Sequence, residues 1–590
     1  MRNVTRFILA LLLTAPNVLG QELSAADLDR RRKALNDLLS EQWEYTMRTQ
    51  PEFASILADK RYNDRMSDIS ETGVRQQLAD ARKFLARFEA IGTAGFSAQE
   101  RINRDLMVRD LRNQIADARF NDWQIPVNQM LGPHLFAVQF PSMLTFTTAK
   151  DYDDFIARMK QYPRMFDQLT TNMRKGMAAR LMPPKFLLEK VAGQAEDIAR
   201  QEAEKSPFAA PLEKFPEGLS ETEQQRIRRE FLDAVRTSVL PAYAKFAAFV
   251  KNEYAPRGRT HAGVWSLPNG KARYVTNAKR MTTTDLTPEQ IHEMGLREVA
   301  RLEGEMLEIA TKLGFSDLKS FNKSVEANPD LRPKSPEEIL DIYRRYTNQM
   351  YAKLPELFAR LPKANMEVVP VEPFREQTAA GANYEPPAPD GSRPGRVYVN
   401  TYQPESRKTI SMESTAYHEG VPGHHMQIAI SQELPDLPPF RRFGGYGAFV
   451  EGWALYSERL GKEVGFYQNP YVDYGRLQDE MLRAIRLVVD TGLHDKKWTR
   501  DQVVQYFHDH SALDEVEIQS ETDRYIVMPG QALGYMIGQL KILELRDRAQ
   551  RELGPKFDIR AFHDEVLGAG ALPLGTLEKR IDDWIAARKK

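Results

Sequence analysis

One stretch of the sequence, from Tyr417 to Gln427, combines residue types that bind metal ions. It reads Tyr-His-Glu-Gly-Val-Pro-Gly-His-His-Met-Gln. The chain has ten histidines, and six of them lie between residues 418 and 510: His418, His424, His425, His494, His508 and His510. This clustering indicates metal ligands, because imidazole and carboxylate groups are the usual ligands of a catalytic zinc ion.

The spacing within this stretch does not fit an uninterrupted helix. Zinc-binding helices carry His-Glu-x-x-His, because residues four apart share one face of a helix. Here Pro422 occupies the fifth position. On a regular helix His424 would lie about 240° around the axis from His418, and His425 would lie about 10.5 Å along it. Neither histidine could then join His418 on one metal ion.

Pro422 and Gly423 predict a break in the helix. Proline lacks the N–H group and clashes with the carbonyl four residues earlier, and glycine adopts backbone angles that other residues avoid. If the Pro-Gly pair loops out of the turn, His424 takes the place of the second ligand and Glu419 stays beside the metal. The alternative is a loop with surface histidines, since Pro-Gly is also ordinary turn chemistry.

A third ligand is expected from a second helix. Glu451 follows the run Gly444-Gly445-Tyr446-Gly447, which permits a turn that returns its carboxylate to the histidines. Glu458 lies seven residues later on the same helix face and is the competing candidate. We therefore predict His418, His424 and Glu451 as metal ligands. Either glutamate could instead be a solvated charge on the helix surface.

These residues resemble a large family of bacterial proteins, the domain of unknown function 885 (DUF885), whose hallmark is His-Glu-x-x-Pro-Gly-His-His. The resemblance covers nearly the whole mature chain and continues through residues 451–456, 490–494, 524–525 and 529–535. The family is similar to the gluzincin metallopeptidases. The resemblance therefore implies a mainly α-helical fold, a zinc ion held by two histidines and a downstream glutamate, and a hydrolytic reaction.

The expected reaction is the hydrolysis of an amide by a metal-activated water, with Glu419 as the general base. The transition state carries an oxyanion, which needs hydrogen-bond donors placed at the metal. The available candidates are His494, Arg524, Tyr525 and Tyr535. Tyr535 matches the downstream tyrosine of similar helical peptidases, and a half-buried core role is its alternative.

Arg524 is expected to bind the C-terminal carboxylate of a substrate, because its planar guanidinium makes paired hydrogen bonds with a carboxylate. An ion pair with Asp523 or Glu521 is the alternative. His425 and Gln427 are candidates for orienting a metal ligand through hydrogen bonds.

The composition excludes several classes of partner. Lysine and arginine number 82, as do aspartate and glutamate, so the formal net charge is zero and no field favours nucleic acid or an anionic membrane. The chain has no cysteine, so no disulfide forms and no lipid attaches through an N-terminal cysteine. Zn²⁺ would be held by histidine and carboxylate alone, a set that also accepts cobalt or manganese.

The N-terminus has the pattern of a signal peptide. Basic residues precede the apolar run Phe7 to Leu13, and Gly20 stands at the expected cleavage site. An uncleaved anchor is the alternative. We expect a single helical catalytic domain over residues 21–590, located in the periplasm or secreted, without stable membrane insertion. Its helical N-terminal part would cover residues 21–365 and its metal-site part residues 366–590.

The run from Gly395 to Thr401 alternates apolar and polar residues like a β-strand. We expect it to form an edge strand beside the metal-binding helices, where an extended peptide can pair its backbone. An ordinary surface hairpin is the alternative.

Together these features predict a zinc peptidase that acts on peptides, as a carboxypeptidase or dipeptidase. A metal-dependent amidohydrolase acting on a non-peptide amide would use the same groups. A non-catalytic periplasmic metal- or solute-binding protein would share the export signal and the histidines. Glu419 argues against that last reading, because a binding protein has no need for a carboxylate beside the metal.

Overall fold

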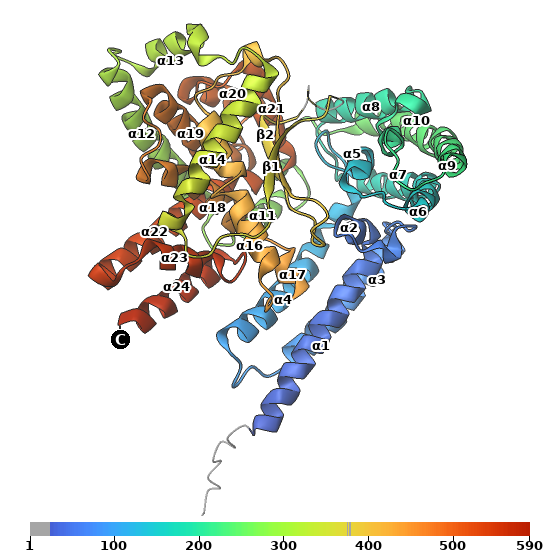
Figure 1. Ribbon diagram of the computed structural model, residues 1–590. Helices are drawn as coiled ribbons and strands as arrows, with labels where there is room; N and C mark the ends of the chain where they lie inside the picture. Colours follow the sequence, from blue (N-terminus) through green and yellow to red (C-terminus); the bar gives the residue numbers. More distant parts are fainter. Residues whose placement is uncertain (1–23, 374–375, 377–378, 590) are drawn as a thin grey trace, which may run out of the picture.

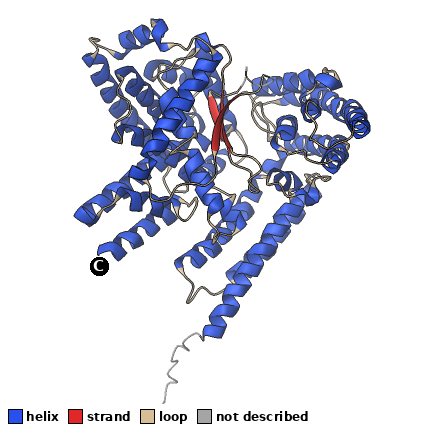
Figure 2. Cartoon of the chain, in the orientation of Figure 1, coloured by secondary structure: helices blue, strands red, loops and turns tan. Residues whose placement is uncertain are grey.

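The computed structural model describes residues 24–373, 376 and 379–589, so the predicted signal peptide, residues 1–20, lies outside it. Helices account for most of the described chain, and one small sheet lies among them (Figure 2). The predicted mainly α-helical fold is confirmed. None of the helices within these ranges has both the length and the apolar character to cross a membrane.

The N-terminal helices form an elongated arm (Figure 1). Serine side chains cap three of its helices, since Ser24, Ser70 and Ser97 each accept a hydrogen bond from the first turn. The apolar faces pack around buried Leu35, Phe88 and other residues. The helices of the arm are α1 (Ala25–Thr49), α2 (Pro51–Ile56), α3 (Glu71–Glu89) and α4 (Ala98–Asp117).

The next six helices form a compact lobe with its own apolar core (Figure 1). Aromatic rings fill this core, and Phe166 packs edge-on against Tyr243 with ring centroids 4.9 Å apart. The helices of this lobe are α5 (Pro133–Gln139), α6 (Ala149–Met159), α7 (Tyr162–Ala178), α8 (Lys185–Ala199), α9 (Glu221–Ala234) and α10 (Leu240–Phe249).

The remaining helices form the largest unit of the fold. Helix α12 packs along α19, and α18 packs along α22. Helices α11 to α14 precede residue 366 but share apolar cores with the later helices. The helices are α11 (Gly270–Thr282), α12 (Pro288–Lys312), α13 (Leu318–Ala327), α14 (Pro336–Leu357), α15 (Met412–Glu419), α16 (His424–Glu433), α17 (Pro439–Arg442), α18 (Gly447–Glu463), α19 (Pro470–His494), α20 (Arg500–His510), α21 (Glu515–Val527), α22 (Gly534–Leu553), α23 (Ile559–Leu567) and α24 (Leu574–Lys589).

The small sheet lies between the lobe and the largest unit (Figure 1). Its strands are β1 (Met366–Pro370), β2 (Ala382–Glu385) and β3 (Gly395–Val399), in the order β1-β3-β2. Strand β3 pairs in parallel with β1, with Met366 opposite Gly395, and antiparallel with β2, with Ala382 opposite Val399. The predicted strand therefore exists, but it is the central strand and not an edge. The edges are β1 and β2.

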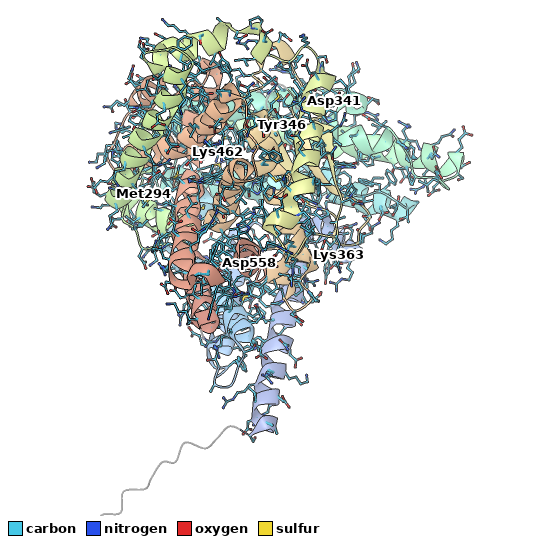
Figure 3. All side chains as sticks on the ribbon, turned by 60° about the vertical axis from the view of Figure 1, so that its left-hand side comes forward. Met294, Asp341, Tyr346, Lys363, Lys462 and Asp558 are labelled. Atoms are coloured by element: carbon cyan, nitrogen blue, oxygen red, sulfur yellow. The ribbon has the colours of Figure 1, made fainter. Side chains whose placement is uncertain are left out.

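The sheet packs against the helix that leads to the metal-ligand motif. Buried Val397 and Val399 of β3 share an apolar core with Met412 and Ala416 of α15. Exposed charged side chains of the largest unit include Asp341 of α14 and Lys462 of α18 (Figure 3). The sheet thus fixes the position of α15 from one side.

Candidate metal centre

The helix breaks within the His-Glu-x-x-Pro-Gly-His-His motif, as predicted. Helix α15 ends at Glu419, and α16 begins at His424. The two ends are tied together because Gly423 N–H donates to the carbonyl of Tyr417 at 3.0 Å. A Cβ atom at Gly423 would collide with the carbonyl oxygen of His418, so this close approach requires glycine.

A tryptophan from another helix anchors the loop between α15 and α16. Trp453 Nε1–H donates to the carbonyl of Pro422 at 2.8 Å, and its ring is fully buried. Trp453 lies on α18, two residues after Glu451. The same helix therefore holds the loop and presents the third predicted ligand.

The structure brings the three predicted metal ligands together. His418 Nε2 lies 3.7 Å from Glu451 Oε2, and His424 Nε2 lies 3.5 Å from the same oxygen. The ligand atoms of all three lie within 4.8 Å of one another. Two atoms each about 2.0–2.1 Å from a tetrahedral zinc ion are separated by roughly 3.4 Å. The donor types and their separations therefore fit Zn²⁺.

The other ring nitrogen of each histidine is held by the protein. His418 Nδ1 is hydrogen-bonded to Glu458 Oε1 at 2.7 Å, and His424 Nδ1 accepts from Gln427 at 3.1 Å. These contacts leave both Nε2 atoms facing Glu451. Glu458, the competing candidate for a ligand, thus orients His418 from behind, and Gln427 does have the orienting position that we expected.

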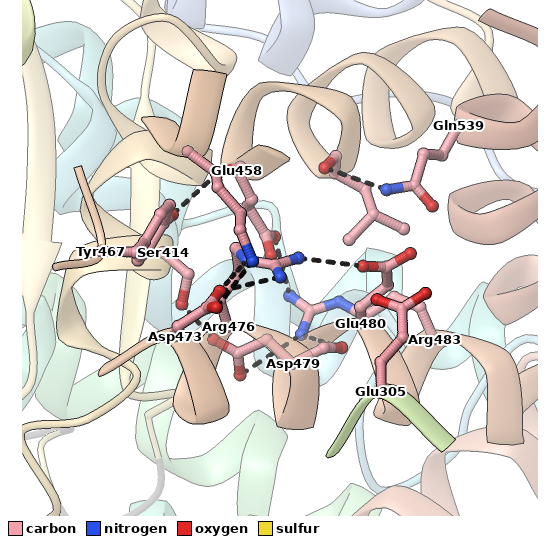
Figure 4. A network of polar contacts seen from close by, with 12 residues as sticks. Glu305, Ser414, Glu458, Tyr467, Asp473, Arg476, Asp479, Glu480, Arg483 and Gln539 are labelled. Atoms are coloured by element: carbon pink, nitrogen blue, oxygen red, sulfur yellow. Dashed lines mark hydrogen bonds and ion pairs between the residues drawn. The ribbon is translucent and has the colours of Figure 1, made fainter. Parts of the chain in front are cut away.

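Glu458 belongs to a larger network of buried charges (Figure 4). Arg483 Nη2 lies 3.7 Å from Glu458 Oε1, and Arg483 Nη1 lies 3.6 Å from Asp479 Oδ1. The hydroxyl of Tyr467 donates to the backbone carbonyl of Glu458 at 2.8 Å. Our sequence reasoning missed Arg483. Its signal was present, because Arg476, Arg483 and Arg486 recur at helical spacing along α19.

His425 faces away from the three ligands. Its Nδ1 is hydrogen-bonded to the hydroxyl of Tyr384 on β2 at 2.9 Å, and its Nε2 to the carbonyl of Ala364 at 3.1 Å. Burial lowers the pKa of His425 to about 4, so the ring is neutral. His425 therefore joins α16 to the sheet, and it does not orient a ligand directly.

Burial and charge act in opposite directions on the ligand group. Burial opposes protonation of His418, but its hydrogen bonds with Glu451 and Glu458 outweigh that effect and raise its pKa to about 9. Burial would raise the pKa of Glu451, yet the two imidazoles lower it well below its usual range. Glu451 is therefore ionised, and its carboxylate attracts a cation.

Glu419 is the last residue of α15 and is only partly buried. It follows His418 directly in the sequence, and its charge is one of the contributions that raise the pKa of that histidine. We find no hydrogen-bond or ion-pair partner for its carboxylate among residues 24–373, 376 and 379–589. The carboxylate predicted to be the general base is thus not engaged by the described protein.

Tyr535 reaches the site through a very close helix crossing. Gly538 of α22 and Gly452 of α18 are in backbone contact, and a Cβ at Gly538 would collide with the carbonyl oxygen of Ala448. This crossing brings Tyr535 near His418, with their rings nearly parallel and their centroids 6.5 Å apart. The ring of Tyr535 therefore lies near the ring of one predicted ligand, His418.

Arg524 lies beside Tyr535. Its Nη2 is 3.3 Å from the hydroxyl of Tyr535, and its Nη1 is 3.2 Å from Glu521 Oε1. Arg486 pairs with the other oxygen of Glu521 at 2.9 Å and lies 4.6 Å from the centre of the Tyr535 ring. Two guanidinium groups thus share one carboxylate. Tyr525 is buried, and its hydroxyl also donates to Glu521.

His494 does not belong to the site, which corrects the prediction that it is an oxyanion donor. Its Nδ1 accepts from the N–H of Val264 at 3.0 Å, and its Nε2 donates to the carbonyl of Tyr525 at 2.9 Å. Burial lowers its pKa to about 3. Both nitrogens are therefore used by the backbone. His508 and His510 lie elsewhere, paired with Glu515 and Glu303.

The conspicuous run from Asp490 to His494 has a positioning role. Asp490 is fully buried, accepts from the hydroxyl of Tyr274 at 2.7 Å, and accepts from Gly530 N–H at 3.1 Å. Gly530 has φ of 84°, a left-handed conformation that favours glycine. Asp490 therefore holds the turn that precedes Tyr535.

The fold and the site define a mainly helical protein in which two buried histidines and a partly buried glutamate converge near Glu419, a carboxylate without a partner in the part of the chain that the structure describes. The family model described as "Bacterial protein of unknown function (DUF885)" matches residues 51–581. The chain therefore belongs to the DUF885 family. No protein among the curated proteins matches it.

Two solved structures share this fold. "The putative lipoprotein from Colwellia psychrerythraea" is 30% identical, with a TM-score of 0.89, and the match covers 94% of this chain and 100% of that one. A "putative lipoprotein of unknown function from Shewanella oneidensis" is 18% identical, with a TM-score of 0.70, and the match covers 93% of this chain and 99% of that one. The second similarity concerns the fold alone.

Proposed function

We propose that this protein is a zinc-dependent peptidase that hydrolyses amide bonds of peptides. The observation that carries the proposal is the position of Glu419. Three donors that fit zinc converge beside it, and its carboxylate has no partner in the described chain. A protein that only stores metal has no use for such a group, whereas hydrolysis requires a base at this place.

The residues around the ligands have distinct roles in this proposal. A bound zinc ion would lower the pKa of its water toward about 7 and polarise the substrate carbonyl. Glu419 would accept the proton of the attacking water and pass it to the leaving amine. The Tyr535 hydroxyl would donate to the oxyanion, and Arg524, 3.3 Å from that hydroxyl, would support the donor.

The charges near Tyr535 favour a substrate with a free C-terminal carboxylate. Arg486 and Arg524 carry two positive charges and share the single negative charge of Glu521. The side chain of Arg524 is 20% exposed, so it can make further hydrogen bonds. We therefore propose a carboxypeptidase or dipeptidase, with Arg524 as the carboxylate-binding residue.

In this proposal the peptide pairs with strand β2, and not with the run from Gly395 to Thr401 as expected from the sequence. Within the described residues β2 pairs only with β3, which leaves its other edge available. The ring of Tyr384, on β2, lies 6.5 Å from the ring of His424 at an angle of 25°. A peptide extended along this edge would pass close to the ligand group.

We place the protein in the periplasm or outside the cell. The support is the signal-peptide pattern over residues 1–20 and the description of both similar solved structures as "putative lipoprotein". Intact-mass measurement of the exported protein tests this. A mass that includes residues 1–20, together with fractionation into membranes, would contradict it.

Glu419→Gln tests the proposed reaction. The variant should keep its zinc and lose about 10²- to 10⁴-fold in kcat, because it retains shape but cannot accept a proton. Glu293→Gln is a matched control, since Glu293 is exposed on α12 and also follows a histidine. Hydrolysis is followed on a peptide library and on non-peptide amides.

The outcomes separate the alternatives. Wild-type protein that hydrolyses only the non-peptide amides would be an amidohydrolase. Zinc binding without turnover of either class would make it a binding protein. An unchanged kcat in Glu419→Gln would remove Glu419 from the mechanism.

A further inference from the structure

A cavity of about 630 Å³ lies between the N-terminal helices and the metal-site unit. One wall comes from α2 and α5, including Phe53 and Phe136. The opposite wall comes from β2, α16 and the start of α18, including Tyr384, Gln427 and Phe449. Cavities of this size accept ligands as large as a short peptide segment.

This cavity is next to the candidate metal centre. Tyr384 packs on the ring of His424, and Gln427 holds Nδ1 of the same histidine. Both residues also line the cavity. Asn383, Tyr384 and Glu385 of β2 form part of its wall, so a chain extended along β2 would have one side facing it. A side chain of that peptide would enter the cavity.

A second cavity, of about 410 Å³, is lined only by residues of the N-terminal helices and the segments between them. It shares the wall residues Phe53, Ile56 and Phe136 with the first cavity. Its other walls are mostly apolar, and include Phe140 and Met165. The two cavities are therefore adjacent and have aromatic side chains in common.

Phe136 is the residue common to both cavities that is most accessible for testing. Its side chain is 38% exposed, although large apolar side chains are normally buried. Its ring lies 5.3 Å from that of Phe140. An exposed aromatic ring at the junction of two cavities offers a surface that an apolar ligand can cover.

We propose that these two cavities bind bulky apolar side chains of the peptide substrate, at positions to one side of the bond that is cleaved. This proposal rests on the proposed function and adds the substrate class, which is peptides with aromatic or large aliphatic residues. Burial of one such side chain favours binding by about 10- to 100-fold over a small polar residue.

The test measures binding separately from hydrolysis. Glu419→Gln protein loaded with zinc is titrated by calorimetry with two short peptides that differ only in carrying two phenylalanines or two serines. Because each buried phenylalanine contributes about 10- to 100-fold, we expect the phenylalanine peptide to bind roughly 10²- to 10⁴-fold more tightly. Phe136→Ser, added to the same background, should reduce this preference by about fivefold or more.

Leu296→Ser is the matched control. Leu296 is 44% exposed on α12 and lines neither cavity, so its loss should leave the preference unchanged. A second variant, Met143→Ser, changes another wall of the larger cavity. If both Phe136→Ser and Met143→Ser keep the full preference, the apolar residues bind elsewhere and the proposal is wrong.

Two further outcomes would also overturn the proposal. One is equal affinity for the two peptides. The other is that the protein binds laurate in a Phe136-dependent way and binds neither peptide. That result would identify the ligand as an anionic amphiphile, attracted to Arg158 in the wall of the smaller cavity. Preference for the phenylalanine peptide, with no hydrolysis by the wild type, would refute the proposed peptidase activity but not the cavity proposal. Hydrolysis without preference would refute the cavity proposal alone.

Discussion

Replacement of His424 by alanine should lower zinc affinity more than replacement of His425, whereas replacement of His425 should lower the free energy of unfolding more. His424 Nε2 lies 3.5 Å from Glu451 Oε2, whereas both nitrogens of His425 are bonded to Tyr384 and to the carbonyl of Ala364. Loss of a group that only orients a ligand weakens metal binding by about 10- to 100-fold. His424→Ala removes a ligand, so its zinc affinity should fall by more than about 100-fold. The zinc affinity of His425→Ala should fall by less than about tenfold.

The stability of the metal-free proteins should show the reverse order. His425 is fully buried and makes two hydrogen bonds, each contributing about 0.5–1.5 kcal/mol, so His425→Ala should lower the free energy of unfolding by roughly 1–3 kcal/mol. Among the described residues, His424 makes one short hydrogen bond, to Gln427 at 3.1 Å, and its contact with Glu451 is longer, at 3.5 Å, so its replacement should cost less stability. Competition with a chelator of known affinity measures zinc binding, and urea titration measures stability. Equal zinc loss in both variants, or zinc loss confined to His425→Ala, would refute the looped-out arrangement.

Four more predictions follow from the contacts around the ligands and around Tyr535. Glu458→Gln should weaken zinc binding by about 10- to 100-fold in the chelator competition, because His418 loses its charged hydrogen-bond partner. Zinc binding near pH 7 should release a proton, measured by calorimetry in buffers of different ionisation enthalpy, because the metal-free pKa of His418 is raised to about 9 and zinc needs the neutral ring. The same raised pKa stabilises the metal-free fold below about pH 6.5, and this contribution is lost as the pH rises through about 9. Arg524→Ala should abolish a roughly ten- to hundredfold preference in kcat/KM for a peptide acid over its amide, and no such preference in the wild type would contradict the carboxylate role.

The break in the metal-ligand helix was predictable because its causes are local. Pro422 cannot continue a helix, and Gly423 permits the contact with the carbonyl of His418. The position of β3 was not predictable in the same way. Alternation of buried and exposed residues is the same in a central and in an edge strand, and the partners of β3 are strands of only four and five residues.

The role of His494 depends on contacts that are distant in sequence. Its nitrogens bind the backbone of Val264 and Tyr525, and backbone groups carry no sequence signal. The clustering of histidines between residues 418 and 510 therefore overstated the number of residues at the site. Tyr384 was missed for a related reason, since its contacts with His424 and His425 exist only once β2 has paired with β3.

The proposal of hydrolysis rather than metal storage rests on a contrast between side chains that the protein holds and Glu419, which has no partner in the described chain. Glu458 and Gln427 fix the rings of His418 and His424, and the contact between Gly452 and Gly538 fixes the helix that carries Glu451. Metal binding then requires little reordering of side chains, which favours affinity. A carboxylate that accepts a proton during a reaction must instead remain free to contact water and substrate. The ligands are held and Glu419 is unpaired within the described chain, which is the arrangement that catalysis needs.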